Sequence, residues 1–329
     1  MTRTPLGSLS FALLLACKPG DAGTTDDGTA GSTAGSTAGS TASEPTTGTA
    51  TTQSTSNPPT SGASTGAETG ATGEPGCADA DGDNLGVGCA AGEDCNDEAI
   101  TCTQDCSDID GNGQPECAEA LGTGVLLFTG ANGGGPPTDL FVDSLAALYT
   151  KAGFVTDITN TFAADFAATN GTLVLLNPLD ALPEKVVSGA RSLLLRGGRV
   201  VLIMEHCKGG CYGNAPGDND FLAAIGSTIR LSGEGGAPLE ETPLTLAAAP
   251  PTAGLTTVMA FYSGSVMPGD GLALGTMDGG NGEVVLAYEA LYNGDIVVAA
   301  DSSIFGYMLD KADNSAFVVA LAGTLLGGP

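Results

Sequence analysis

Short apolar runs alternate with amphipathic stretches over residues 122–329. A run that is apolar at every position is typical of a strand buried on both faces of a sheet. An apolar residue at every third or fourth position is instead typical of a helix that covers such a sheet. The runs that predict central strands are residues 125–128, 173–176, 200–203, 284–287 and 296–299.

Three stretches between and after these runs have the helical pattern. The first has Leu140, Phe141, Leu145 and Leu148 on one face. The second has Val186, Val187, Ala190, Leu193 and Leu194, and the third is the closing stretch over residues 314–326. Strands that alternate with amphipathic helices predict an α/β domain. We expect this domain, residues 122–329, to have a mainly parallel sheet with helices on both faces.

The first sixteen residues have the pattern of a signal peptide, with Arg3 as the charged start and residues 9–16 as a short apolar core. This stretch ends in Leu14-Leu15-Ala16-Cys17, which resembles the lipobox of bacterial lipoproteins. The resemblance implies that residues 1–16 are removed and that lipid, palmitate included, on Cys17 anchors the chain to a membrane. An ordinary secretory signal that contains a cysteine is the alternative.

Residues 17–76 begin with the lipidated Cys17 and continue as a linker of Thr, Ser, Gly, Ala and Pro. This composition buries too little apolar surface to offset the entropy of ordering, so we expect a disordered tether. No apolar run is long enough for a membrane-spanning helix. Lys18 stands where an Asp is associated with retention in the inner membrane. We therefore expect an exported protein, anchored in the cell envelope at the outer membrane.

The chain is strongly acidic, with 10 Lys and Arg against 38 Asp and Glu and a formal net charge of −28. Such a protein repels phosphate backbones, which argues against nucleic-acid binding, and it attracts cations. Solubility alone is the alternative explanation of the charge.

Nine cysteines at uneven spacing indicate an oxidising compartment. Without Cys17 their number is even, as a disulfide framework requires, although the sequence does not give the connectivity. The cysteines expected in disulfides are Cys77, Cys89, Cys95, Cys102, Cys106 and Cys117 in one cluster, and Cys207 and Cys211 in a separate pair.

Residues 77–121 are a Cys-rich acidic segment, which we call the neck. It has few large apolar side chains and no Lys or Arg, so disulfides, metal or both must hold it together. Its first loop alternates carboxylates with other residues, a spacing that wraps oxygen ligands around a hard cation. The expected ligands are Asp79, Asp81, Asp83 and the Leu85 carbonyl, with Asp94, Asp97 and Glu93 in place of the missing EF-hand Glu.

The second loop of the neck satisfies the EF-hand loop pattern in full. Its expected ligands are Asp108, Asp110, Asn112, Glu116 and Glu119, with the Gln114 carbonyl. Neither flank reads as a long helix, so this is a calcium loop without a true EF-hand. The neck resembles the Asp/Gly/Cys-rich metal-binding repeats of secreted bacterial proteins and, more distantly, thrombospondin type 3 repeats. Carboxylates without His or Met favour structural calcium over copper. An acidic spacer that binds no ion tightly is the alternative.

Two stretches of the α/β domain carry a further resemblance. Arg196-Gly197-Gly198-Arg199 leads into one strand, and Asn293-Gly294-Asp295 leads into another that ends at Asp301-Ser302-Ser303. The pattern resembles the class I glutamine amidotransferase-like superfamily in its non-amidotransferase branches. The resemblance implies a flavodoxin-like sheet, in a superfamily that includes non-catalytic domains. The Gly-x-Cys-x-Gly nucleophile motif of the amidotransferases is absent from this sequence.

Cys207 follows a strand, and Cys211 lies four residues later in a Gly-rich loop. In an exported protein a disulfide between them is the favoured interpretation, and a nucleophilic Cys207 is the alternative. His206 is the only histidine of the chain. Because neighbouring side chains on a strand point to opposite faces, His206 and Cys207 make a poor catalytic pair.

Open α/β sheets bind ligands beyond the carboxyl ends of their strands. The expected ligand pocket is therefore formed by Asn132, Asn177, Glu205, His206 and Asp301. The Gly-rich turn at residues 130–135 could present amides to an anion or be only a turn. Asp301 could equally support the start of the segment that follows it.

Three functional hypotheses fit these patterns. The preferred one is a non-enzymatic lipoprotein whose calcium-stabilised neck presents the α/β domain to an unknown surface protein or small ligand. The second is a hydrolase of unknown substrate that uses Glu205, His206 and Asp301. The third is a structural component of the envelope. Convergence of the strand-end residues in one pocket would favour a ligand or enzyme site over a scaffold.

Overall fold

The computed structural model describes residues 89, 94, 95, 102, 105–131, 139–163, 165–205, 213–235, 240–278 and 282–323. The chain divides into two compact units, residues 1–66 and 67–329. Every described residue belongs to the second unit. The predictions for the signal peptide, for lipidated Cys17 and for the linker lie outside the described residues.

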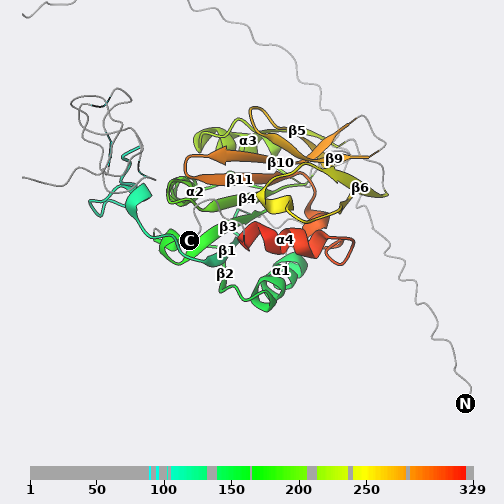
Figure 1. Cartoon of the computed structure of the whole chain (residues 1–329), viewed down its shortest axis with the longest axis horizontal. Coiled ribbons are helices and arrows are strands. Elements are labelled where there is room, and N and C mark those ends of the chain that lie inside the picture. Colours follow the sequence, from blue (N-terminus) through cyan, green and yellow to red (C-terminus); the bar gives the residue numbers. More distant parts are fainter. Residues whose placement is uncertain are drawn as a thin grey trace, which may run out of the picture. The chain divides into compact units, whose positions relative to one another are not determined.

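The second unit is a mixed α/β structure around a nine-stranded sheet with the order β2-β1-β3-β4-β11-β10-β9-β6-β7 (Figure 1). Its first five strands are parallel to one another. The strands expected at residues 125–128, 173–176, 200–203 and 296–299 are all present in this parallel half of the sheet. β2 is a further parallel strand that the sequence analysis did not predict. The parallel strands are β1 (Gly124–Phe128), β2 (Thr156–Thr159), β3 (Asn170–Leu176), β4 (Arg199–Ile203) and β11 (Gly294–Ala299).

The other half of the sheet is antiparallel, so the expectation of a mainly parallel sheet is wrong for these strands. The cause is visible at the turn between β10 and β11, where Leu291 pairs with Gly294 across only two residues. So short a connection joins antiparallel strands alone, because a parallel crossover needs a dozen residues or more. The antiparallel strands are β10 (Val284–Leu291), β9 (Leu272–Met277), β6 (Glu241–Leu246) and β7 (Val258–Phe261), and β5 (Arg230–Gly235) pairs with β8 (Gly264–Met267) in a second sheet.

Helices cover both faces of the sheet, as expected from the sequence. They are α1 (Asp139–Lys151), α2 (Glu184–Leu195), α3 (Ala215–Ala224) and α4 (Asn314–Gly323), with short 3-10 helices η1 (Glu116–Ala118), η2 (Phe166–Ala168), η3 (Pro250–Thr252) and η4 (Ser302–Phe305). Residues of α1 and α4 share one apolar cluster with the sheet, and residues of α2 and α3 share the other. Within the described ranges, no helix has the length and apolar character needed to cross a membrane.

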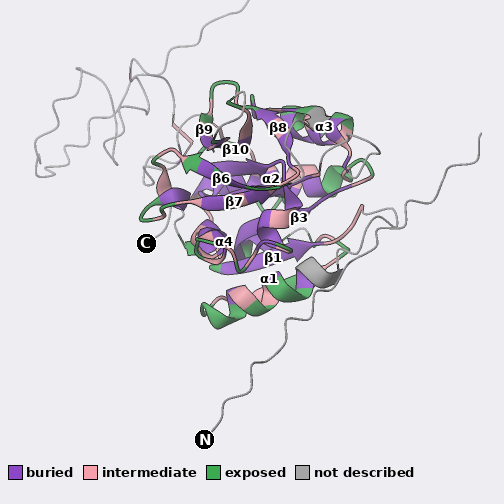
Figure 2. Ribbon diagram, turned by 90° about the vertical axis from the view of Figure 1, so that its right-hand side faces the viewer, coloured by how far each residue is buried: buried purple, intermediate pink, exposed green. Residues whose placement is uncertain are grey.

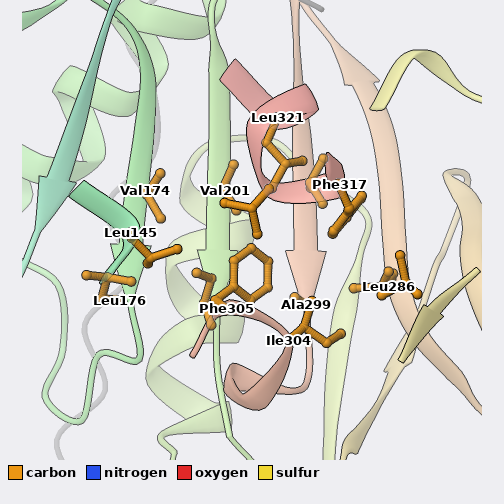
Figure 3. Close-up of a cluster of buried hydrophobic side chains, with 14 of the residues drawn as sticks. Leu145, Val174, Leu176, Val201, Leu286, Ala299, Ile304, Phe305, Phe317 and Leu321 are labelled. Atoms are coloured by element: carbon orange, nitrogen blue, oxygen red, sulfur yellow. The ribbon is translucent and has the colours of Figure 1, made fainter. Parts of the chain in front are cut away.

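The parallel strands are buried over their whole length except in β2, as Figure 2 shows for β1 and β3. Consecutive side chains point to opposite faces, so Leu126 packs on the α2 side while Leu127 packs on the α1 side. Figure 3 shows side chains of this α1-side cluster, among them Leu145 of α1, Leu321 of α4 and Phe305 of η4. This double burial explains why these strands are apolar at every position.

Candidate functional site

The candidate site lies at the carboxyl ends of three parallel strands. Asn177 follows β3, Glu205 follows β4 after one residue, and Asp301 follows β11 after one residue. Because these strands are neighbours in the sheet, their ends lie at one edge, and the backbone N–H of Asn177 donates to the Ile203 carbonyl at 2.7 Å. The other two residues of the expected pocket, Asn132 and His206, lie outside the described residues, so the pocket as a whole stays a prediction.

Asp301 is fully buried, and protein donors occupy both oxygens of its carboxylate. Its Oδ2 accepts the backbone N–H of Phe261 in β7 at 2.7 Å, and its Oδ1 accepts that of Ser303 at 2.8 Å. Asp301 is thus the N-cap of η4 and also binds the edge strand of the sheet. The sequence analysis left two roles open for Asp301, one catalytic and one supporting the segment that follows it. These contacts give Asp301 the supporting role.

Glu205 is half-buried beside Asp301, and its Oε1 accepts a hydrogen bond from the Ser302 hydroxyl. Burial, and to a lesser extent the nearby charge of Glu205, raise the pKa of Asp301 to about 7, although the hydrogen bonds from Phe261 and Ser303 act to lower it. Two carboxyl groups of which one is protonated near neutral pH are a known basis for acid–base catalysis. Here, however, the protonatable group is enclosed and already bound on both oxygens.

Two non-glycine residues with left-handed backbones lie at the same edge of the sheet. Ala131 has φ 63° and Asn177 has φ 44°. The Ala131 carbonyl accepts the N–H groups of both Leu179 and Asp180 at 2.8 Å, which joins the loop after β1 to the loop after β3. Backbones in this region cost about 1–3 kcal/mol and cluster at functional sites. They lie where the order of the parallel strands reverses, the usual ligand position of open α/β sheets.

Asp218 is a buried acid that the sequence analysis did not single out. It is 1 % exposed in the first turn of α3, its Oδ2 has no hydrogen-bond partner, and burial raises its pKa to about 8. In the sequence Asp218 comes shortly after the N-cap Asn214 and Pro216. An acidic residue at this position is typical of a solvated side chain in the first turn of a helix. Only the packing of α3 on the sheet reveals its burial.

The second acidic loop of the neck, for which calcium was predicted, is closed by hydrogen bonds of its own. Asp108, at the first position, accepts the backbone N–H groups of Gly111, Asn112 and Gly113 at 2.7, 3.1 and 2.9 Å. The Asn112 amide donates to the carboxylates of Asp110 and Glu119. The expected ligands at positions 1, 3, 5 and 12 therefore gather around one loop, and their oxygens suit a hard cation.

The remaining expected ligand, Glu116, faces the α/β domain. Its side chain is fully buried, and its Oε2 accepts from the Ser192 hydroxyl at 2.6 Å and from Nε of Arg196 at 2.7 Å. Arg196 also forms ion pairs with Asp110 and Glu119. Among the described residues, no group of three or more His, Cys, Asp or Glu side chains is arranged to hold a metal ion. Calcium therefore stays a prediction, and most of the first loop (Asp79, Asp81, Asp83, Glu93 and Asp97) lies outside the described residues.

Disulfides link Cys95 to Cys106 and Cys102 to Cys117, with Cα–Cα distances of 5.2 and 5.1 Å. Cys89 is disulfide-bonded as well. Cys77, Cys207 and Cys211 lie outside the described residues, so the proposed pair near His206 has no structural test here.

Comparisons with known proteins add little to this picture. No family model and no curated protein matches the chain. Among solved structures, the mmIFT52 N-terminal domain has a TM-score of 0.47 at 12% identity, covering 62% of this chain and 98% of that one. The cytoplasmic protein STM1381 from Salmonella typhimurium LT2 has a TM-score of 0.45 at 13% identity over 56% and 86% of the two chains. A β-galactosidase from Rahnella sp. R3 has 0.44 at 13% over 63% and 31%. At such scores the likeness carries no argument about function.

Proposed function

We propose that this protein is an exported lipoprotein, anchored through lipid on Cys17, whose neck presents a non-enzymatic α/β domain to a small ligand or a partner protein. The observation that carries the non-enzymatic assignment is the Asp301 carboxylate. Both of its oxygens bind backbone N–H groups, and the side chain is fully enclosed. A general acid or base must reach the reacting group directly or through one water, which this carboxylate does not.

We assign the α/β domain to the flavodoxin-like class. The support is the order β2-β1-β3-β4-β11 of its parallel strands, which corresponds to the 2-1-3-4-5 order of that class. In such sheets the ligand lies where the strand order reverses, here beyond β1 and β3. The left-handed backbones of Ala131 and Asn177 favour the same position.

The neck is proposed to bind calcium through its second loop. Asp108, Asp110, Asn112 and Glu119 supply the oxygen ligands, and Glu116 instead joins the loop to α2. When bound, calcium would neutralise carboxylates that otherwise repel one another. The role is structural, with an affinity of about 10⁻⁴–10⁻³ M, as in extracellular modules.

Photo-crosslinking on intact cells tests the binding assignment. A genetically encoded photo-crosslinker replaces Asp180, which is exposed and lies beside the strand-order reversal. The matched control replaces the exposed Asp143 of α1. We expect a defined adduct, identified by mass spectrometry, from position 180 and none from position 143. Equal labelling at both positions, or none at either, would contradict a binding site at this edge of the sheet.

A further inference from the structure

Residues 105–119 of the neck lie along α2 and are held there by polar contacts at three positions. We call this segment the strap. Asp105 Oδ2 pairs with Arg191 Nη2 at 3.0 Å, near the middle of the helix. The Ser192 hydroxyl donates to Glu116. Arg196, at the C-cap of α2, binds Glu116, Glu119 and Asp110. The strap is thus attached to the second half of α2 and to its end.

The central contact of the strap is buried. The Arg196 side chain is 4 % exposed and that of Glu116 is not exposed at all. Besides Ser192 and Arg196, the Glu116 carboxylate accepts the backbone N–H groups of Ile109 and Asp110 at 3.1 and 3.2 Å. The Glu116 carboxylate therefore both holds the backbone of the strap in its fold and attaches the strap to α2.

The strap has almost no apolar core to hold it in place. Within residues 105–119, only Glu116 and Cys117 are buried. Neither apolar cluster of the α/β domain includes a residue of this segment. Without a core, the entropy of ordering has to be offset by crosslinks and ion pairs. Two disulfides supply crosslinks, Cys95–Cys106 and Cys102–Cys117, and the second ends at the residue next to Glu116.

We infer that the strap is a disulfide-dependent latch on α2. It stays docked while the Cys102–Cys117 disulfide and the Arg196–Glu116 ion pair are both present, and it is released when either is lost. Release by reduction needs a dithiol reductant. The reductant gives up two electrons and two protons and becomes a disulfide itself, while the Cys102–Cys117 bond breaks into two thiols.

The α/β core should stay folded when the latch opens. The ion-pair partners that the described residues give Arg196 are all carboxylates of the strap, so we expect release to return its charge to solvent rather than to leave it buried without a partner. The strap also lies at the amino end of β4, whereas the candidate site lies at the carboxyl end. Opening the latch therefore leaves the strand ends around Glu205 and Asp301 in place.

Hydrogen exchange of the full mature chain, followed by mass spectrometry, tests the latch. After reduction with a dithiol we expect the amides of residues 107–119 to exchange at least about tenfold faster, while β3 and β4 keep their protection. The oxidised Arg196→Gln variant should show the same gain in exchange. Its matched control is Arg191→Gln, whose side chain is 40% exposed in its pair with Asp105 and which should exchange like the wild type.

Three results would overturn the inference. The first is unchanged protection of the strap after reduction, and the second is unchanged protection in oxidised Arg196→Gln. The third is loss of protection in β3 and β4 together with the strap, since this would make the segment part of the core. Because a dithiol also reduces Cys95–Cys106, the oxidised double variant Cys102→Ser, Cys117→Ser decides the question even if the Arg196 variant does not fold. It should show the same faster exchange of residues 107–119, and unchanged protection of the strap in this variant would overturn the inference as well.

Discussion

Arg199 and Asp295 form a bidentate ion pair in the interior, with side chains that are 0% and 1% exposed. The pair joins the first residue of β4 to the second residue of β11, which are neighbours in the sheet. Nη1 of Arg199 also donates to the Leu321 carbonyl at 2.8 Å near the end of α4. The buried guanidinium of Arg199 therefore links two strands and the end of a helix through charge-assisted hydrogen bonds.

Replacing Asp295 by Ala should lower the free energy of unfolding by about 3–5 kcal/mol, because it leaves the Arg199 charge buried and unpaired. The double variant Arg199→Met, Asp295→Leu should be less destabilised than Asp295→Ala. The control is Glu241→Ala at the exposed Lys311–Glu241 pair, which should unfold like the wild type. Urea unfolding monitored by circular dichroism gives these values. A wild-type midpoint for Asp295→Ala would contradict the prediction.

Asp218 should make the stability of the domain decrease as the pH rises. Its pKa is about 8 in the folded protein and 3.8 in a solvated reference, so between these values the folded state binds a proton that the unfolded state releases. The free energy of unfolding therefore falls as pH rises through this window. Relative to Asp218→Asn, the wild type should lose about 1 kcal/mol per pH unit between pH 5 and 8.

Denaturation series at several pH values measure this difference. Asp220→Asn, at an exposed position of the same helix, is the control and should follow the wild type. A constant difference between the wild type and Asp218→Asn over the whole range would show that Asp218 does not titrate in this window.

Calcium should stabilise the neck of the full mature chain, and chelation should lower the temperature at which it melts. Asp108→Asn is the informative variant, because among the described contacts Asp108 binds loop amides only, whereas Glu119 also binds Arg196. We expect calorimetry to show a calcium-dependent shift in the wild type and in Asp143→Asn, and a much smaller shift in Asp108→Asn. The same calcium response in all three would leave the loop without a role in ion binding.

Cys17 should carry the membrane anchor. Metabolic labelling with a fatty acid should mark the wild type, and the Cys17→Ser variant should be unlabelled and either soluble or uncleaved. Labelling is the decisive measurement, since fractionation alone could reflect association with another membrane protein. A wild-type chain without lipid would contradict the lipoprotein proposal.

Mass mapping of the oxidised protein should show Cys207 linked to Cys211. The mapping has an internal reference in the Cys95–Cys106 and Cys102–Cys117 disulfides. If Cys207 is alkylated without prior reduction while these two bonds are intact, the alternative of a reactive thiol after β4 gains support.

Much of the α/β domain could be predicted from the sequence because its parallel strands are buried on both faces. Residues 173–176 and 200–203 are apolar at every position, and the helices between such runs repeat apolar residues every third or fourth position. The strands that sequence analysis missed have weaker patterns. In β6, for example, buried and exposed positions alternate over six residues that include Pro243. The direction of β10 was missed because a two-residue turn decides it.

The positions of three candidate-site residues could be predicted, whereas the pocket itself stays a prediction. Asn177, Glu205 and Asp301 were expected at one edge because each follows a strand of the same sheet, and the order of elements along the chain is enough for that inference. The sequence also determined the spacing of carboxylates in the acidic loop of residues 108–119 and the even set of cysteines beyond Cys17. The use of the Asp301 carboxylate could not be foreseen, since its donors Phe261 and Ser303 come from a distant strand and from the next helix.

The tertiary structure alone decided which charges meet. Glu116 has a ligand's position in the loop pattern, yet its partner Arg196 lies 80 residues further along the chain. The Arg199–Asp295 pair spans 96 residues. Local patterns record which face of a strand or helix is buried, because burial repeats with the period of the element. A single ion pair has no period, so only the folded chain shows which carboxylate a buried guanidinium binds.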